Sequence, residues 1–235
     1  EPILWNTIRI SLYSFATFPC SIIFALMINE LTNHKFKKTV QMISYMPHFI
    51  STVVVCAMVH MFFNVDGGIV NNAIVALGGE PVPFMYKAKY FDHLYVWSGV
   101  WQGIGWGTII YLANLSNVSP DLIEAARIDG ASRWDVVVHI NIPTILPTVV
   151  IMLILRVGSI MGVGFEKVFL LQTDLNLSAS RVISTYVYER TLGAGGTTAY
   201  WDYSAAIGLF NTFINLILII LTNTIARKVS DIALW

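Results

Sequence analysis

Five stretches of mostly apolar residues constrain this chain more than any other feature of its sequence. Each is about as long as the roughly 20 residues that a helix needs to cross a bilayer. They fall at about 7–28, 40–63, 94–115, 144–163 and 203–225. With 56% hydrophobic and 12% charged residues, the chain lies outside the composition of ordinary soluble proteins. We therefore expect an all-α, polytopic membrane protein that forms one transmembrane domain over residues 1–235.

Prolines, glycines and charges refine this prediction. Pro47 predicts a kink near the start of the second stretch. The third stretch has glycines four residues apart, which favours close packing of another helix; they are Gly99, Gly103 and Gly107. The polar regions 64–90, with a helical turn near 69–77, and 165–202 are expected outside the cell. Basic residues near 34–38 and 227–228 favour the cytoplasmic side there.

One charged segment, residues 119–143, interrupts the apolar pattern. Ser119 followed by Pro120 predicts the start of a short helix that ends near Asp129. Gly130 stands where a left-handed turn is needed, and Ser132 with an acidic residue three positions later predicts the cap of a second short helix. Pro143 is expected to bring that second helix toward its end.

This segment resembles the cytoplasmic loop of the membrane subunits of binding-protein-dependent ABC importers. The matching pattern is Glu-Ala-Ala, three residues, Gly, nine residues, Ile, one residue, an aliphatic residue and Pro. The aliphatic position holds Ile142, where the family more often has Leu. The residues that match, together with the acidic residue before the glycine, are Glu124, Ala125, Ala126, Asp129, Gly130, Ile140 and Pro143.

The resemblance implies a type I importer permease whose cytoplasmic loop, 116–143, docks on an ATPase subunit. In such a complex Glu124 contacts the ATPase cleft, Ala125 and Ala126 permit close docking, and Gly130 sets the turn. Members have six core helices, so one further span is expected before Glu1. The implied partners are a second homologous permease, two ATP-binding subunits that hold ATP and Mg²⁺, and an external solute-binding protein. The implied location is the inner membrane of a prokaryote, in contact with lipid.

Flanking motifs resemble the carbohydrate branch of this family, which imports sugars and oligosaccharides. They are Tyr45-Met46-Pro47-His48-Phe49, Gly105-Trp106-Gly107-Thr108, Gly164-Phe165-Glu166 and the terminal Leu234-Trp235. An importer of a non-sugar solute remains the main alternative. A stand-alone channel or ion-driven transporter would leave the charged loop unexplained, and an integral-membrane enzyme would need a cluster of reactive residues.

Polar and aromatic residues inside the apolar stretches are candidates for the translocation path, because polar groups are costly in lipid. Trp101 and Gln102 suit the faces and hydroxyls of sugars, but aromatic residues also mark membrane interfaces, so an interfacial role is the alternative. Asn211 and Asn215 lie four residues apart on one helix face and either line the path or bond to another helix. Arg156, expected mid-span, either serves the path, where it could pair with the carboxylate of an acidic sugar, or forms a structural ion pair with Glu166 or another chain.

The sequence offers no basis for catalysis or metal binding. It contains no Gly-x-x-x-x-Gly-Lys-Ser/Thr phosphate loop, so we expect no bound cofactor in this chain and ATP hydrolysis only in a partner. Its five histidines lack the spacing of metal ligands, and no nucleophile with a neighbouring base stands out. The formal net charge of zero gives no reason to expect nucleic acid.

Overall fold

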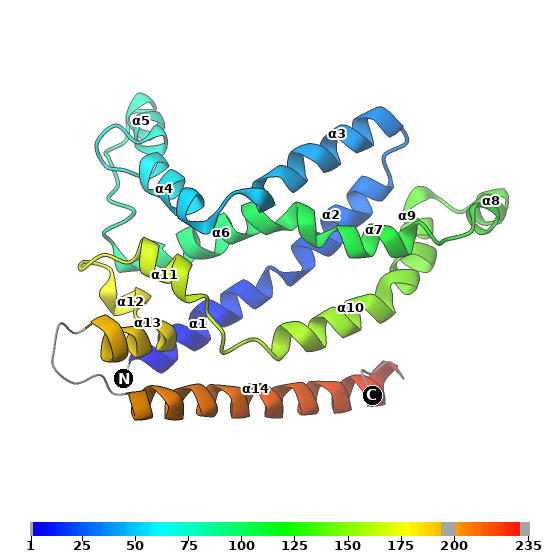
Figure 1. The fold of residues 1–235 in the computed structure, drawn as a ribbon. Coiled ribbons are helices and arrows are strands. Elements are labelled where there is room, and N and C mark those ends of the chain that lie inside the picture. Colours follow the sequence, from blue (N-terminus) through cyan, green and yellow to red (C-terminus); the bar gives the residue numbers. More distant parts are fainter. Residues whose placement is uncertain (1, 194–200, 231–235) are drawn as a thin grey trace. The chain divides into compact units, whose positions relative to one another are not determined.

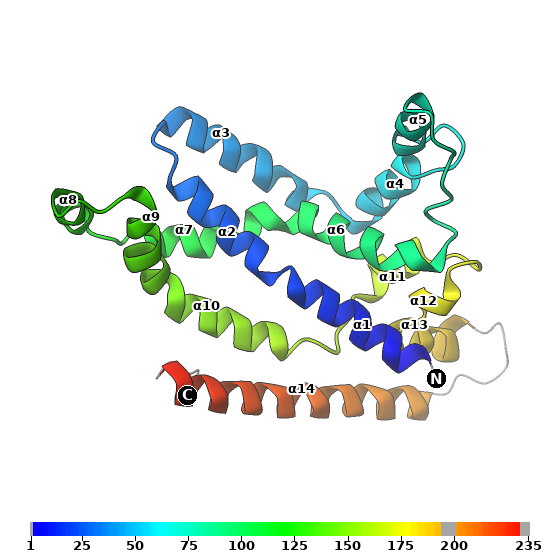
Figure 2. The same ribbon diagram turned by 180° about the vertical axis from the view of Figure 1, so that it is seen from behind.

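The computed structural model describes residues 2–193 and 201–230 and contains only helices and connecting segments there (Figures 1 and 2). The terminal Leu234-Trp235 motif lies outside the described residues. The chain divides into two compact units. Unit 1 comprises residues 1–16, 50–100 and 159–217, and unit 2 comprises residues 17–49, 101–158 and 218–235.

Three described helical stretches are long and apolar enough to cross a membrane, and a sharply bent pair is a fourth candidate. The three are Ile3–Asn29, Arg133–Val157 and Trp201–Lys228. The first contains α1 (Pro2–Ala16) and α2 (Phe18–Asn29), and the last is α14 (Trp201–Ser230). The predicted third span, 94–115, is helical as α6 (Ala88–Gly107) and α7 (Ile109–Leu115), which are not among these candidates.

The predicted second span, 40–63, is not one continuous helix. It divides into α3 (His34–Tyr45), the short 3₁₀ helix η1 (Met46–Phe49) and α4 (Thr52–Phe62), with a bend of 99° between the two helical parts. Pro47 lies in η1 and has no amide hydrogen to donate. Ser51 then has an extended backbone, and its Oγ accepts a hydrogen bond from the Val54 amide at 3.4 Å, which starts α4.

The predicted fourth span is displaced along the chain. Residues 158–163 were expected inside it, but α10 (Ile142–Val157) ends at Val157. Glycines at 158, 162 and 164 explain the early end, because glycine has low helix propensity. The helical stretch begins earlier than expected as well, since α9 (Arg133–Val136) and the π-turn η2 (Val137–Asn141) lead directly into α10.

Unit 1 is held together by an apolar cluster and by buried polar bonds. The cluster draws on α1, α4, α6, α11 (Phe165–Leu171) and α12 (Leu177–Ser180). Buried Asn6 donates from Nδ2 to the carbonyls of Ser178 and Arg181 at 2.9 and 3.1 Å. His60 donates to the Leu170 carbonyl at 2.9 Å, joining α4 to α11. The predicted turn near 69–77 is α5 (Ile69–Ala76).

Unit 2 has a smaller apolar cluster formed by α2, α7 and α10. α7 packs against both of the other helices. Asn114 on α7 donates from Nδ2 to the Thr148 hydroxyl on α10 at 2.7 Å. α8 (Pro120–Ile128) stands away from this cluster at one end of the unit (Figures 1 and 2). The cluster therefore supports the charged segment without covering it.

Candidate functional site

The charged segment forms a helix, a turn and a second helix, as its sequence predicts. α8 begins after Ser119, whose extended backbone (φ −61°, ψ 129°) matches the predicted N-cap position. Its side chain makes no capping hydrogen bond, so Pro120 in the first turn and Asp121 near the positive end of the helix dipole remain as the starting signals. The helix ends at Ile128, one residue before the predicted end.

Gly130 makes the turn after α8. Its φ of +88° lies in the left-handed region, which favours glycine because a side chain is strained there. The Gly130 amide donates to the Arg127 carbonyl at 3.1 Å, and the Ala131 amide donates to the Ala126 carbonyl at 2.9 Å. The glycine turn predicted from the sequence is therefore confirmed, and it anchors the segment to the Ala126 backbone.

The second helix is capped by a reciprocal pair. The Asp135 amide donates to Ser132 Oγ at 3.2 Å, and the Ser132 amide donates to Asp135 Oδ2 at 2.9 Å. This capping box starts α9 as predicted. The prediction that Pro143 helps to end this helix is wrong, because the helical path continues through η2 into α10. The π-turn bonds the Ile142 amide to the Val137 carbonyl, and Pro143, which lacks an amide hydrogen, follows it at the start of α10.

The residues of the predicted coupling loop present an open surface. α8 has no buried residue, and Glu124, Ala125, Asp129 and Gly130 are all exposed. Pro143 is exposed as well, whereas Ala126 and Ile140 are partly buried. Asn141, which lies next to Ile140, is buried and donates from Nδ2 to Glu30 Oε1 at 3.3 Å, which ties the loop to the end of α2.

Three large apolar residues of the loop were not predicted as part of the site. Leu122 is 53% exposed, Ile128 is 86% exposed and Trp134 is 73% exposed. Exposed apolar side chains gathered around one protruding helix are typical of a protein-binding surface. Their signal in the sequence was weak, because Ile128 and Trp134 each stand between two charged residues and Leu122 directly follows Asp121.

The predicted path residues fall in both units: three belong to unit 2, and the two asparagines of α14 belong to unit 1. Trp101 on α6 is 45% exposed, and neighbouring Gln102 is partly buried. Arg156 was expected mid-span, but it lies in the last turn of α10 because that helix ends at Val157. Asn215 Oδ1 accepts a hydrogen bond from the Met161 amide at 3.4 Å, which favours its structural alternative. Asn211 Oδ1 is buried without a hydrogen-bond partner and remains a candidate for the path.

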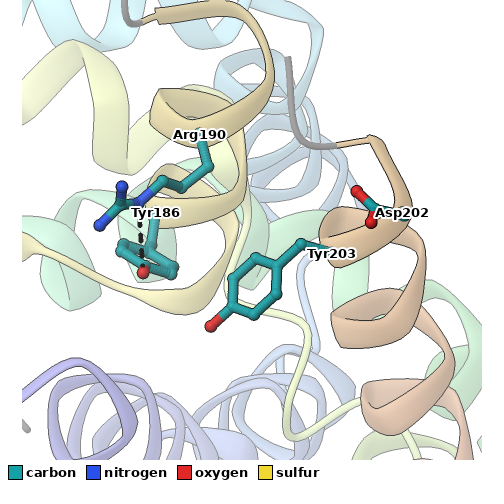
Figure 3. A pocket seen from close by; sticks show the side chains of 4 residues that line it. All are labelled: Tyr186, Arg190, Asp202 and Tyr203. Atoms are coloured by element: carbon teal, nitrogen blue, oxygen red, sulfur yellow. Dashed lines mark hydrogen bonds between the residues drawn. The ribbon is translucent and has the colours of Figure 1, made fainter. Parts of the chain in front are cut away.

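A pocket of about 300 Å³ in unit 1 was not predicted. It is lined by Tyr186 of α13 (Ile183–Tyr188), Arg190 of the π-turn η3 (Glu189–Gly193), and Asp202 and Tyr203 of α14. Figure 3 shows Tyr186 and Arg190 on one side of the pocket and the two α14 residues on the other. These residues belong to a region that the sequence analysis treated as an external loop, where no motif distinguished them.

These features define a class: an integral membrane protein made of helices, with a capped, exposed loop between apolar helices. The family model described as "Binding-protein-dependent transport system inner membrane component" matches residues 17–231. The chain belongs to this family.

Three comparisons show the similarity of this chain to known transport proteins. "Protein LplB" of Bacillus subtilis (strain 168) is 39% identical over 96% of this chain and 70% of its own length. The "Polygalacturonan/rhamnogalacturonan transport system permease protein YteP" of the same strain is 39% identical over 98% of this chain and 72% of its own. A crystal structure of a bacterial alginate ABC transporter, in complex with an alginate pentasaccharide-bound periplasmic protein, matches with a TM-score of 0.94 and 35% identity over 99% of this chain and 80% of that one. The type I importer permease fold predicted from the sequence is confirmed.

Proposed function

We propose that this chain is the permease subunit of an ATP-driven importer of sugars or oligosaccharides. The observation that carries the proposal is the exposed helix and glycine turn at residues 119–135, held on a membrane domain of the importer fold. The sugar assignment is supported by the substrates that the names of related transporters give: polygalacturonan, rhamnogalacturonan and alginate. A related solved transporter imports "the acidic polysaccharide alginate", so acidic oligosaccharides are the first substrates to test.

The proposed complex contains one chain of this kind, a second related permease, two ATPase subunits and an external solute-binding protein. It works in a prokaryotic inner membrane, surrounded by lipid. ATP and Mg²⁺ are bound by the ATPase subunits, and this chain is not an enzyme. Ion-driven transport would require no ATPase partner, so copurification of such a partner separates the two alternatives.

In the proposed mechanism, closure of the ATPase subunits on ATP moves the loop that docks on them. Glu124 supplies an exposed acidic contact, while the small side chains of Ala125 and Ala126 let the partner approach the α8 backbone. Gly130 and the Ser132 cap fix the direction in which α9 leaves α8. Because α9 continues through η2 into α10, motion of the loop is transmitted directly to a membrane helix. The membrane domain then alternates between outward-open and inward-open states.

The first experiment measures ATPase activity of the reconstituted complex with its binding protein. A panel of neutral and acidic oligosaccharides is compared with amino acids and phosphate. Stimulation by oligosaccharides alone is the expected result. Stimulation by an amino acid or phosphate, with no response to any sugar, would contradict the sugar assignment while leaving the importer class intact.

Two substitutions test the coupling loop. Gly130→Asp forces a side chain into a backbone with φ +88°, and Ala126→Trp places bulk on the docking face. Both variants are expected to insert into the membrane normally while ATP hydrolysis no longer drives transport. We expect transport to fall about tenfold or more, as for the loss of a central interface contact of about 1.4 kcal/mol or more.

Gly78→Asp is the matched control for Gly130→Asp. Gly78 has a φ of +84° and open space where a Cβ would lie, like Gly130, but it lies far from the loop in sequence, after α5. It carries the same backbone strain and is expected to leave coupling intact. Normal transport by both loop variants would refute the coupling role.

A further inference from the structure

The pocket between α13, η3 and α14 has the chemistry of a sugar-binding site. Its volume of about 300 Å³ is at the lower end of the ~300–1,000 Å³ typical of small-molecule sites, which suits a short stretch of a glycan rather than a long chain. Two tyrosines, an arginine and an aspartate line it. Aromatic rings pack against the C–H faces of sugars, and charged side chains hydrogen-bond their polar groups.

The position of the pocket along α14 places it at a membrane surface. Asp202 lies in the first turn of α14, and Arg227 and Lys228 lie in the last turn. A helix of 30 residues is about 45 Å long, more than the roughly 30 Å of the hydrocarbon core. The two ends of α14 therefore lie on opposite sides of the membrane. With the basic end in the cytoplasm, as the proposed function requires, the pocket opens where substrate is delivered.

One wall of the pocket is a tyrosine and an arginine that hold each other in place. Arg190 Nε donates to Tyr186 Oη at 3.2 Å, and the Arg190 guanidinium lies 5.2 Å from the centre of the Tyr186 ring (Figure 3). Arg181 lies over the same ring at 5.4 Å and is paired with Glu189. These contacts reduce the freedom that Arg190 would lose on binding a ligand.

The opposite wall carries a second ring and a negative charge. The Tyr203 ring lies 6.5 Å from that of Tyr186 at 76°, and its side chain is 49% exposed. Asp202 is exposed beside it. An arginine on one side and a carboxylate on the other make the site directional: an anionic group is attracted to Arg190 and repelled by Asp202, while sugar hydroxyls can donate to Asp202.

We propose that this pocket is a subsite for a carboxylated sugar residue, a uronate, of the transported oligosaccharide. The sugar carboxylate binds Arg190, the sugar ring packs against the exposed Tyr203 ring, and a sugar hydroxyl donates to Asp202. This inference rests on the proposed function and assigns the recognition of substrate charge to unit 1. It differs from the prediction that Arg156 pairs with an acidic sugar, because Arg156 lies in unit 2, in the last turn of α10.

The test compares Arg190→Gln with wild type in the reconstituted importer. ATPase stimulation is measured with binding protein loaded either with a galacturonate tetramer or with a neutral galactose tetramer. For the uronate, Arg190→Gln is expected to raise the half-saturating concentration about tenfold, because it removes a charge-assisted hydrogen bond. The response to the neutral tetramer is expected to stay unchanged. Arg190→Lys keeps the charge without the planar fork, so its half-saturating concentration for the uronate is expected to lie between those of wild type and Arg190→Gln.

Lys87→Gln is the matched control. Lys87 is an exposed cation of unit 1 outside the pocket, so its loss changes the net charge equally and is expected to alter neither response. An equal loss for both sugars in Arg190→Gln, or no loss for either, would overturn the subsite. If the neutral tetramer alone stimulated the ATPase activity of wild type, the uronate subsite would also be overturned, but the proposed function would stand. Wild type stimulated by no sugar would reject the proposed function itself.

Discussion

At position 105 the chain has room only for glycine. A Cβ built there would lie 2.1 Å from the Ser44 carbonyl oxygen and 2.4 Å from its carbon, far inside van der Waals contact. The four-residue spacing of Gly99, Gly103 and Gly107 predicted close packing at those three positions. A Cβ built at Gly107 would lie 2.6 Å from Ser21 Oγ and one at Gly99 would lie 3.0 Å from Lys167 Nζ, but a Cβ at Gly103 would have no such neighbour within 4 Å. Spacing alone therefore did not identify the position of closest approach.

Gly105→Ala is expected to destabilise the protein, because α6 and the backbone of α3 would have to separate to admit the methyl group. Overpacking of this kind typically costs about 1–3 kcal/mol. Thermal denaturation of the purified protein in detergent, followed by size-exclusion chromatography, measures the loss as a lower unfolding temperature.

Gly103→Ala is the control for that substitution. It lies on the same helix in open space, and alanine has the higher helix propensity. Its unfolding temperature is expected to match or exceed that of wild type. A Gly105→Ala variant as stable as Gly103→Ala would show that α3 and α6 are not in close contact.

At the scale of helices, unit 1 relies on a charged pair that joins three elements. Arg9 on α1 donates from Nε to Asp92 Oδ2 at 2.6 Å and from Nη2 to Asp92 Oδ1 at 3.0 Å, and Asp92 lies on α6. Arg9 Nη2 donates to the Ala179 carbonyl on α12 at 3.1 Å as well. Two parallel bonds to one carboxylate fix the orientation of both helices better than a single contact would.

Asp92→Asn is expected to lower the stability of unit 1, since it removes the charge while keeping the shape of the side chain. The Asp92 side chain is 16% exposed and that of Arg9 is 32% exposed, so solvent weakens the pair only partly. We expect a cost of about 1–3 kcal/mol. Thermal denaturation in detergent measures it.

Asp66→Asn, at an exposed position outside the pair, is the control and should leave the unfolding temperature within error of wild type. Arg9→Lys keeps the charge but loses the forked geometry, so its unfolding temperature is expected to lie between those of wild type and Asp92→Asn. If Asp92→Asn unfolds at the wild-type temperature, the pair contributes nothing to the stability of the unit.

At the scale of the whole molecule, most of the apolar surface of the candidate spans lies outside the two cores. No residue of the most apolar stretch of α14 is buried within the chain. Phe213, Leu216 and Ile220 of this helix are all exposed. An apolar helix that its own chain covers only in part is stable only when lipid or another subunit covers the rest. The chain is therefore an integral membrane protein, as its family membership states.

The predicted orientation can be measured with single cysteines. In a variant with Cys20 and Cys56 replaced by alanine, Leu77→Cys places a thiol beside α5 and Ile128→Cys places one at the end of α8. Both parent side chains are highly exposed, at 89% and 86%. A membrane-impermeant maleimide is expected to label position 77 in intact cells and position 128 only after permeabilisation. The reverse pattern would invert the topology and contradict the proposed coupling role.

The sequence alone determined those features that depend on local chemistry. Apolar stretches of bilayer length predicted helices, Gly130 predicted the positive φ that the structure shows, and Ser132 with Asp135 predicted the capping box. Each of these depends on residues close together in the chain, so neighbouring residue types suffice to predict it. The spacing of Glu124, Gly130 and Pro143 likewise pointed to the family that the comparisons confirmed.

Only the tertiary structure decided how sharply a helix bends and which distant residues meet. Pro47 predicted a kink in the second span but not its size of 99°, and the contact of Gly105 with Ser44 depends on packing between segments far apart in sequence. The pocket is another such case, since Tyr186 and Tyr203 come together only when α13 and the start of α14 lie side by side. Hydropathy and spacing carry no information about such long-range neighbours, because these contacts are set by the shape of whole helices.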